Sequence, residues 1–562
     1  MADQGSTDEG KMPLEYFYHW ERARADHVFL TQPAGGGVVR DITWRQAGDE
    51  LRRMAAWLKA QGWPAGSKVA ILGKNSAHWI LADLAIMMAG HVSVPMYSTF
   101  NAEALRYILE HSEARACFIG KLDDTASLKD GVPAGVPLIA LPLAAPLEGL
   151  SWNTLIAANT PLAGEPVAQP DDLWTIVYTS GTTGRPKGVM LKFGALKWAA
   201  GPALRRITFS IEDRFISYLP LAHIMERIVI EMTAIHHGCH IFFAEALDTF
   251  LKDLQRARPT MFLSVPRLWV KFQQGVHAKL PPEKLQRLLK IPLVGWLVRR
   301  KILKGLGLEH CRFAGSGAAP LPAEVLRWYR NLGLDLLEGY GMTENYAISH
   351  AILPGTSHPG TVGVPYAGVD SRIDAETGEV QMRSPALMAG YYKDPEGTAA
   401  AFTADGWLRT GDKGVVDADG CLRITGRVKD IFKTSKGKYI SPAPIEDLLI
   451  NHPAIEVCVV TGANFTQPIA LLMLSPDAMA AAKGSGRGAL VDSLSAHVEA
   501  VNARLDAHEK LDCVAVISAL WTPENGFVTP TLKVKRNRIE EAYAAKYEGW
   551  IRQRKTVVWA EG

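Results

Sequence analysis

The stretch YTSGTTGRPKGVM, residues 178–190, decides how this sequence is interpreted. Between Thr179 and Val189 it places three glycines, four hydroxyl side chains and one lysine, Lys187. The preceding run LWTIVYT (173–179) is rich in β-branched and aromatic residues and predicts a buried strand. Ligands of α/β sheets bind beyond strand ends, where backbone N–H groups and hydroxyls can surround an anion. The stretch therefore predicts a phosphate-binding loop.

This loop does not follow the Walker pattern GxxxxGK[ST]. Counting from Gly181, the second glycine position holds Pro186, and Gly188 follows Lys187 where Ser or Thr would bind Mg²⁺. The pattern excludes a Walker nucleotide triphosphatase. The alternative is a flexible Gly/Ser/Thr linker, but a strand that leads straight into the cluster argues against it.

The order of predicted elements indicates a mainly parallel α/β sheet. Helical periodicity in residues 42–62, 80–90 and 102–113 alternates with the short apolar runs 92–97 and 116–120. With 562 residues the chain exceeds one ordinary core, so at least two domains are expected.

The pattern of predicted elements changes near residue 405. DG turns occur at Asp405-Gly406 and Asp419-Gly420, the second between short alternating strands. We expect a domain boundary close to Arg427–Asp430, which divides the chain into residues 1–428 and a smaller α/β domain, 429–562. Within the smaller domain, 480–488 is expected to be a surface loop.

Composition narrows the class of protein. The 61 basic and 58 acidic residues give a net charge of +3, which disfavours a general nucleic-acid binder. The six cysteines are scattered and contain no CxxC pair, as in reduced cytoplasmic proteins. The N-terminal segment lacks the apolar core of a signal peptide. The apolar stretch 79–96 contains Asp83 and His91, so it predicts a buried helix and strand in a soluble protein.

Six further segments accompany the glycine-rich loop: YLPLAHIMER (218–227), FAGSGAAPL (313–321), LEGYGMTE (337–344), WLRTGD (407–412), GRVKD (426–430) and TPTLKVKR (529–536). Together with TSGTTGxPKG, in this order, they make the chain resemble the adenylate-forming acyl-CoA synthetase superfamily over nearly its whole length. LPLAHIMER and TPTLKVKR are most similar to the long-chain fatty acyl-CoA synthetase branch.

The resemblance implies a large N-terminal α/β domain with subdomains and a small, mobile C-terminal lid. It implies a two-step reaction: a fatty acid and ATP give acyl-AMP and pyrophosphate, and coenzyme A then displaces AMP. Mg²⁺ would assist the first step. Because the second step needs the space that a catalytic group occupies in the first, a lid that rotates would serve both.

The resemblance also assigns a nucleotide-binding set of residues. The β- and γ-phosphates would bind to Thr179, Ser180, Gly181, Thr182, Thr183, Gly184 and Lys187. Adenine would lie against Gly317, Ala318, Ala319, Gly339, Tyr340, Gly341 and Met342. Asp412 would accept hydrogen bonds from the ribose hydroxyls, with Arg427 beside it.

The remaining roles concern the chemistry. Thr343 would contact the α-phosphate, Glu344 would bind Mg²⁺, and Lys533 would be the catalytic lysine, with Lys535 as the alternative. The common form of the family has Gly-Lys where this chain has Leu532-Lys533. His223 would lie between the acyl carboxylate and the thiol; a packing role is the alternative. Lys429 would be the hinge, and Lys436 and Gly437 would face the site after rotation.

Residues 279–307 hold eight Lys or Arg residues and one Glu among Leu, Ile, Val and Trp296. A basic amphipathic surface of this kind could dock on anionic lipid, whereas a solvated helix pair is the alternative. Two other functions remain open: an adenylating ligase for an aryl acid or a carrier protein, and a non-catalytic nucleotide-binding protein. Retention of five residues together argues against the latter: Lys187, Glu344, Asp412, Arg427 and Lys533.

Overall fold

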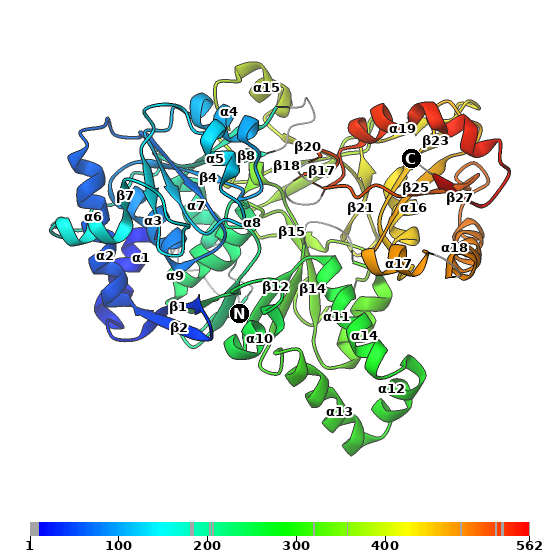
Figure 1. Ribbon diagram of the computed structural model, residues 1–562, viewed down its shortest axis with the longest axis horizontal. Coiled ribbons are helices and arrows are strands. Elements are labelled where there is room, and N and C mark those ends of the chain that lie inside the picture. The colour runs from blue at the N-terminus through cyan, green and yellow to red at the C-terminus, as the bar shows by residue number, and fades with distance from the viewer. Residues whose placement is uncertain are drawn as a thin grey trace. The chain divides into compact units, whose positions relative to one another are not determined.

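The computed structural model describes residues 10–179, 185–201, 204, 207–317, 321–356, 358–483, 486–522, 525–529 and 533–560. The chain forms two compact units, one of Met1–Ser371 with Met382–Leu408 and one of Arg372–Gln381 with Arg409–Gly562 (Figure 1). The second unit therefore includes residues upstream of 428; the functional boundary between 428 and 429 stays a prediction. A large and a smaller α/β unit agree with the expected fold class.

An eight-stranded sheet forms the centre of the first unit. Pairing is parallel from the third strand to the last, whereas the first two strands run antiparallel to their neighbours. The expectation of a mainly parallel sheet is thus confirmed. The strand order is β19 (Gly390–Tyr391), β9 (Lys187–Lys192), β8 (Leu173–Thr179), β4 (Val92–Met96), β3 (Lys68–Leu72), β5 (Ala116–Ile119), β6 (Leu138–Ala140) and β7 (Leu150–Ser151).

Two further sheets complete the strands of this unit. A four-stranded sheet has the order β10 (Arg214–Ser217), β11 (His240–Phe243), β1 (Val28–Gly35) and β2 (Val38–Thr43). A five-stranded sheet has the order β12 (Met261–Ser264), β13 (Phe313–Ser316), β14 (Leu336–Tyr340), β15 (His350–Ala351) and β16 (Val364–Pro365).

Helices connect these strands and cover them. They are α1 (Pro13–Ala23), α2 (Trp44–Ala60), α3 (Ala77–Met88), α4 (Ala102–Ser112), α5 (Ala126–Gly131), α6 (Trp152–Ala158), α7 (Phe193–Ala200), α8 (Ile224–Glu226), the π-helix η2 (Arg227–Met232), α9 (Thr233–His237), α10 (Phe250–Ala257), α11 (Pro266–Lys279), α12 (Pro282–Leu289), α13 (Pro292–Gly305), α14 (Ala323–Asn331), the 3₁₀ turn η3 (Thr343–Asn345) and α15 (Pro395–Ala401).

Helix α3 shows how the core accommodates charge. All of its residues are buried, as expected for a helix that is apolar on every side. Its one acid, Asp83, accepts hydrogen bonds from Arg227 Nη2 at 2.6 and 2.7 Å. The Arg227 guanidinium lies 4.0 Å from the centre of the Trp174 ring, and burial raises the pKa of the neighbouring Glu231 carboxyl. The predicted buried helix and strand at 79–96 are thus confirmed.

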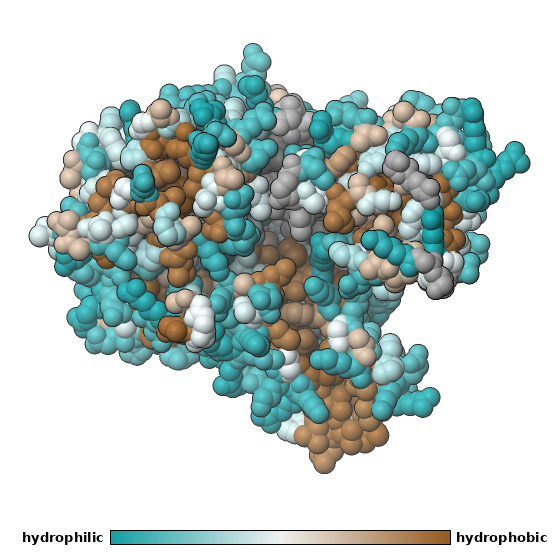
Figure 2. All heavy atoms as spheres, viewed as in Figure 1, coloured by the Kyte–Doolittle hydropathy of each residue, from teal (hydrophilic) through white to brown (hydrophobic). Residues whose placement is uncertain are grey.

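Helices α12 and α13 form a hairpin that protrudes from the first unit (Figure 1). Each begins with proline at its first turn, where the missing N–H costs no helical hydrogen bond. Apolar side chains gather at the outer end of the hairpin (Figure 2). Among the described residues, no helix has both the length and the hydrophobicity to cross a membrane.

The second unit contains three sheets. One consists of β17 (Asp370–Ile373), β18 (Glu379–Arg383), β20 (Leu408–Val416) and β21 (Leu422–Arg427); another of β22 (Phe432–Lys433) and β23 (Tyr439–Ile440); the third of β24 (Ile455–Thr461), β25 (Ile469–Leu474), β26 (Val514–Ile517) and β27 (Val557–Ala560). The helices are α16 (Pro442–Leu449), α17 (Pro476–Ala481), α18 (Gly486–Asn502) and α19 (Arg536–Ile551).

Alternation along β24 and β25 places helices on both faces of this last sheet. Val460 and Leu472 share a core with residues of α16 and α18, whereas their neighbours Val459 and Leu471 share one with residues of α19. The hairpin at Asp419-Gly420 joins β20 and β21 as predicted. The loop expected at 480–488 is shorter, because α17 continues to Ala481 and α18 starts at Gly486.

Candidate active site

The predicted phosphate loop connects β8 and β9. Thr179 ends β8 and faces Lys187, the first residue of β9, in the antiparallel register. Ser180, Gly181, Thr182, Thr183 and Gly184 lie outside the described residues. The chain enters a strand after the loop, whereas a Walker loop enters a helix, so this geometry agrees with the exclusion of a Walker site.

The side chain of Lys187 has two partners from a later segment. Its Nζ lies 3.0 Å from Oδ2 of Asp394 and 4.7 Å from the centre of the Tyr391 ring. Asp394 also caps α15 by accepting the N–H of Gly397 at 2.7 Å. The hydrogen bond from Lys187 holds the pKa of the Asp394 carboxyl below its usual range. The ammonium is thus held in place beside the loop.

Tyr391 joins Lys187 to Glu344. The Tyr391 hydroxyl donates to Oε1 of Glu344 at 2.9 Å, and the Glu344 carbonyl accepts the N–H of Met388 at 2.8 Å. Thr343 and Glu344 form the buried turn η3, each 8% exposed. Burial, reinforced by the Glu344 charge, raises the pKa of Tyr391, so its hydroxyl remains a donor. The structure therefore brings a cation and a carboxylate together.

The sequence did not lead us to predict Tyr391 and Asp394 as residues of the site. The run KDP at 393–395 does carry a local signal, since Asp before Pro is typical of a helix start. This signal predicts the cap of α15 but not its contact with a lysine on β9. That contact arises because β19 pairs with β9, with Tyr391 opposite Val189.

The ends of β13 and β14 supply the glycines expected near a base. A Cβ added to Gly317 would lie 3.3 Å from the Met225 sulfur and 3.5 Å from the Gly339 carbonyl oxygen. The strand ends thus approach closely, as β13 and β14 pair in parallel. Ala318 and Ala319 lie outside the described residues. Tyr340 ends β14, with its ring 6.2 Å from that of His350.

Gly341 and Met342 form the turn that leads to Thr343. A Cβ on Gly341 would come within 2.4 Å of the Ala347 carbonyl oxygen, so only glycine fits there. The N–H of Met342 donates to Oδ1 of Asn345 at 2.8 Å. Close packing and this hydrogen bond therefore explain the sequence of the turn independently of any ligand.

His223 begins α8. Its Nδ1 accepts the N–H of Met225 at 3.2 Å, which fixes the ring orientation. Met225 in turn lies beside Gly317, so the His223 segment adjoins the end of β13. The packing alternative is therefore supported by a contact, and the catalytic role of His223 stays a prediction.

Glu226, on the same helix, fixes the chain that precedes His223. Its Oε1 accepts the Ser217 hydroxyl at 2.8 Å and the Tyr218 N–H at 3.0 Å. Burial raises the pKa of Glu226 from 4.5 to about 8. The carboxyl is thus protonated in the folded protein at neutral pH.

A pH-dependent loss of stability follows from Glu226. Because its folded pKa exceeds the unfolded value, the stabilisation is complete below pH 4.5 and is lost as pH rises towards 8. The loss amounts to roughly 5 kcal/mol at most. Glu226→Gln, which mimics the protonated acid, should flatten the pH dependence of the melting temperature between pH 5 and 8. Glu212→Gln, an exposed carboxylate, should not; identical profiles for both variants would contradict the assignment.

In the second unit, Asp412 and Arg427 are direct partners. They face each other in the β20–β21 ladder, and Arg427 Nε lies 2.9 Å from Asp412 Oδ1. Asp412 is largely buried, whereas half of the Arg427 side chain is exposed. The predicted pairing of these two residues therefore matches the geometry, and their contact with ribose stays a prediction.

Lys533 lies shortly before α19, in a segment whose Val534 pairs antiparallel with Val528. Its N–H donates to Thr529 Oγ1 at 3.0 Å, and its carbonyl accepts the Thr529 N–H at 2.8 Å. The residue is exposed, and residues 530–532 lie outside the description. Arg536, the arginine of LKVKR, anchors the segment after Lys533 by donating to both Glu446 oxygens at 2.6 Å and to Asp430 Oδ2 at 3.1 Å.

The other predicted residues of this unit are exposed. Lys429 and Lys436 both face solvent. Gly437 has a φ of +74° in the turn between β22 and β23, where its N–H donates to the Thr434 carbonyl at 2.9 Å. The turn alone accounts for glycine at this position. Roles as a hinge or as contacts of coenzyme A stay predictions.

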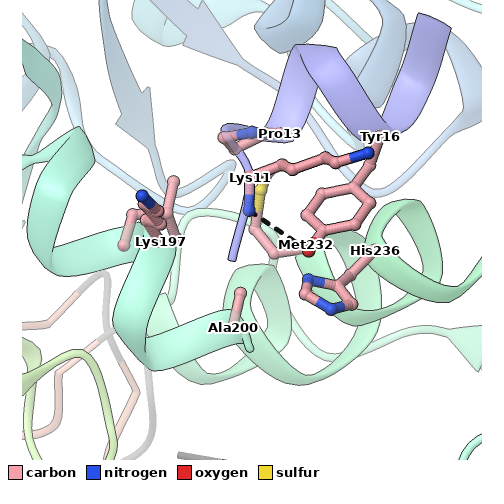
Figure 3. A pocket seen from close by; sticks show the side chains of 8 residues that line it. Lys11, Pro13, Tyr16, Lys197, Ala200, Met232 and His236 are labelled. Carbon is pink, nitrogen blue, oxygen red and sulfur yellow. Dashed lines mark hydrogen bonds between the residues drawn. The ribbon is translucent and has the colours of Figure 1, made fainter. Parts of the chain in front are cut away.

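A hollow between α1, α7 and α9 does not serve as the site (Figure 3). Its volume is about 10 Å³, which suffices for a water molecule but not for a nucleotide or an acyl chain. The lining includes Lys11, Tyr16, Lys197, Met232 and His236, and the Lys11 N–H donates to the Tyr16 hydroxyl at 3.2 Å.

Comparison with known proteins agrees with this arrangement. Residues 17–392 match the AMP-binding enzyme family, and residues 429–553 match the AMP-binding enzyme C-terminal domain. The chain belongs to the family of AMP-binding enzymes, which confirms the resemblance found in the sequence.

Two relatives are similar over nearly the whole chain. Long-chain-fatty-acid–CoA ligase FadD15 of Mycobacterium bovis is 32% identical, with 94% of this chain and 95% of that protein covered. Long chain acyl-CoA synthetase 6, peroxisomal, of Arabidopsis thaliana is 31% identical, with 94% and 84% covered.

Solved structures show the same fold. The anthranilate CoA ligase AuaEII in complex with anthranoyl-AMP has a TM-score of 0.78 at 23% identity and covers 96% of this chain and 98% of its own. ATP-bound MatB from Rhodopseudomonas palustris has a TM-score of 0.74 at 24% identity, with 95% and 99% covered.

Proposed function

We propose that this chain is an ATP-dependent, AMP-forming fatty acyl-CoA synthetase for medium- or long-chain fatty acids. The observation that carries the proposal is the contact series from Lys187 through Tyr391 to Glu344. It offers a cation for polyphosphate beside a carboxylate for a metal ion. The names of the two relatives, both long-chain ligases, support the choice of acid.

In the first step, a carboxylate oxygen of the acid attacks the α-phosphorus of ATP, and the bond to the bridging oxygen of pyrophosphate breaks. Both reactants are anionic, so positive charge must be supplied at fixed positions. Lys187 and the hydroxyls of the loop would hold the leaving β- and γ-phosphates. Thr343 would contact the α-phosphate, and Lys533 would neutralise the carboxylate and the α-phosphate. Asp412, with Arg427 beside it, would bind the ribose.

The residues around Glu344 fit Mg²⁺. A buried carboxylate is a hard oxygen ligand, and Mg²⁺ takes most of its remaining ligands from water and phosphate. Tyr391 would orient this carboxylate through its hydrogen bond. When bound, the ion would supply positive charge to the phosphate oxygens.

In the second step, the sulfur of coenzyme A attacks the acyl carbonyl carbon as it loses its proton, and AMP leaves with the bridging oxygen. Rotation of the lid about Lys429 would withdraw Lys533 and present Lys436 and Gly437 to the pantetheine arm. His223 would lie between the acyl group and the thiol.

The proposal also includes a cytoplasmic location, no nucleic-acid partner, and peripheral membrane contact through residues 279–307.

Pyrophosphate release across a panel of carboxylic acids, with and without coenzyme A, tests the proposal. We expect release that depends on fatty acid and a thioester that appears only with coenzyme A. Release without any thioester would favour transfer to a carrier protein, and release only with aryl acids would change the substrate. Without acid-dependent release, a non-catalytic nucleotide-binding protein would be the better account.

Tyr391→Phe is expected to raise the Mg²⁺ concentration for half-maximal activity by about 10-fold, because the hydrogen bond that orients the Glu344 carboxylate is lost while the ring beside Lys187 remains. The matched control is Tyr392→Phe, whose hydroxyl donates to Glu113 instead. Titrations of activity with Mg²⁺ measure the effect. Equal Mg²⁺ dependence in both variants would remove Tyr391 from this role.

A further inference from the structure

The outer end of the α12–α13 hairpin exposes large apolar side chains. Leu293 is 77% exposed, Leu297 55%, Trp296 54% and Ile291 50%, and Val294 is exposed beside them. These five residues are named the apolar tip, and brown, hydrophobic side chains gather at this end of the hairpin (Figure 2). Apolar side chains scattered singly are ordinary on a protein surface, but a contiguous group marks an interaction site.

Helices α12 and α13, which carry the apolar tip, pack closely against each other. Leu285 of α12 is buried at 2% exposure. Gly295 of α13 is also buried, and a Cβ there would lie 2.6 Å from the Leu289 carbonyl oxygen, so only glycine lets the two helices approach this closely. The exposed apolar residues therefore belong to an ordered helix start.

Basic residues follow the tip along the helix. All eight Lys and Arg residues of 279–307 are exposed, against the single acid Glu283. In α13 the basic collar of Arg299, Arg300, Lys301 and Lys304 comes after the apolar residues, and the Arg300 guanidinium lies 5.5 Å from the centre of the Trp296 ring. Within α13 the apolar and basic groups are thus separated along the helix axis, not around it as for a helix lying flat on a surface, whereas Lys290 directly precedes the tip.

The distance between the apolar tip and the basic collar matches the depth of the headgroup region of a bilayer. From Leu293 in the apolar tip to Arg299, the first residue of the basic collar, the helix rises about 9 Å. An apolar segment that enters a membrane surface typically penetrates about 5–10 Å, so the collar would lie at the level of the headgroup phosphates. Tryptophan is also favoured at this interface.

We infer that the apolar tip inserts into the headgroup boundary of an anionic bilayer while the basic collar binds lipid phosphates. A second copy of this chain is disfavoured as the occupant, because a two-fold contact would bring the two basic collars together. The inference rests on the membrane contact included in the proposed function. It concerns binding alone and can fail while the ligase activity stands.

Vesicle flotation without ATP or coenzyme A tests the inference. The wild-type chain should bind vesicles with about 30 mol% phosphatidylglycerol and bind phosphatidylcholine vesicles at least 10-fold more weakly. The variant L293S/W296S/L297S should lose at least 10-fold of the binding, as should R299Q/R300Q/K301Q/K304Q. Leu247→Ser is the control, because Leu247 is 91% exposed but lies outside the hairpin. Unchanged melting temperatures would show that each variant is folded.

Three results would overturn the inference: no binding to anionic vesicles, equal binding to neutral vesicles, or tip variants that bind like the wild type. A fourth such result would come from light scattering of the protein without vesicles. A dimer that dissociates in the tip variant would assign this surface to a second copy of the chain.

Discussion

Lys533→Ala is expected to reduce acid-dependent pyrophosphate release by about 10³-fold, while thioester formation from supplied acyl-AMP continues at a similar rate. Lys533 is exposed, its backbone N–H is held by Thr529, and Arg536 anchors the segment that follows it. Such a group can neutralise two repelling anions in the first step and withdraw before the second. Single-turnover assays of the two half-reactions measure the difference.

The matched control is Lys535→Ala, the other lysine of the same segment. Its N–H donates to the Phe527 carbonyl at 2.8 Å, a backbone contact that the substitution preserves. It should leave both half-reactions within a few-fold of wild type. If Lys535→Ala blocked adenylation instead, the catalytic lysine would be misassigned, and equal loss of both half-reactions in Lys533→Ala would contradict a withdrawing lid.

The second large effect concerns Lys187. Lys187→Met should lower kcat/KM for ATP by about 10²-fold, because the cation that holds the leaving phosphates is lost and the Asp394 carboxylate remains beside the loop. Thioester formation from supplied acyl-AMP should be unaffected, since pyrophosphate takes no part in it. The ATP dependence of pyrophosphate release measures the effect.

Two companion variants sharpen this prediction. Lys192→Met changes a lysine at the other end of β9, which pairs with Asp171 on the surface, and should behave like wild type. Lys187→Met with Asp394→Asn should recover part of the lost activity, because the uncompensated carboxylate is removed. A double variant no better than Lys187→Met would show that Asp394 exerts no repulsion on the phosphates.

Local pattern was sufficient for much of the fold. The strand at 173–179, the buried helix and strand at 79–96 and the hairpin at Asp419-Gly420 follow from periodicity and turn chemistry, which act over a few residues. The same patterns predicted the glycine-rich loop after the first of these strands, whereas Gly317 and Tyr340 were assigned through the family resemblance.

Local sequence patterns could not predict contacts between distant segments. Tyr391 meets Lys187 only because β19 joins the sheet beside β9, and one sequence does not specify which strands pair. The same holds for Arg227, whose buried contact with Asp83 links η2 to α3. The family resemblance supplied roles for Asp412 and Lys533 and placed Arg427 beside Asp412. It did not reveal that Arg536 anchors the segment on which Lys533 lies.

The transfer of oxygen tests the central claim most directly. Fatty acid labelled with ¹⁸O in both carboxyl positions is incubated with ATP, Mg²⁺ and coenzyme A, and the products are analysed by mass spectrometry. If the carboxylate attacks the α-phosphorus and the thiol then attacks the acyl carbon, AMP carries one ¹⁸O and pyrophosphate carries none. Unlabelled AMP, or label in pyrophosphate or orthophosphate, would contradict adenylation as the chemistry of this chain.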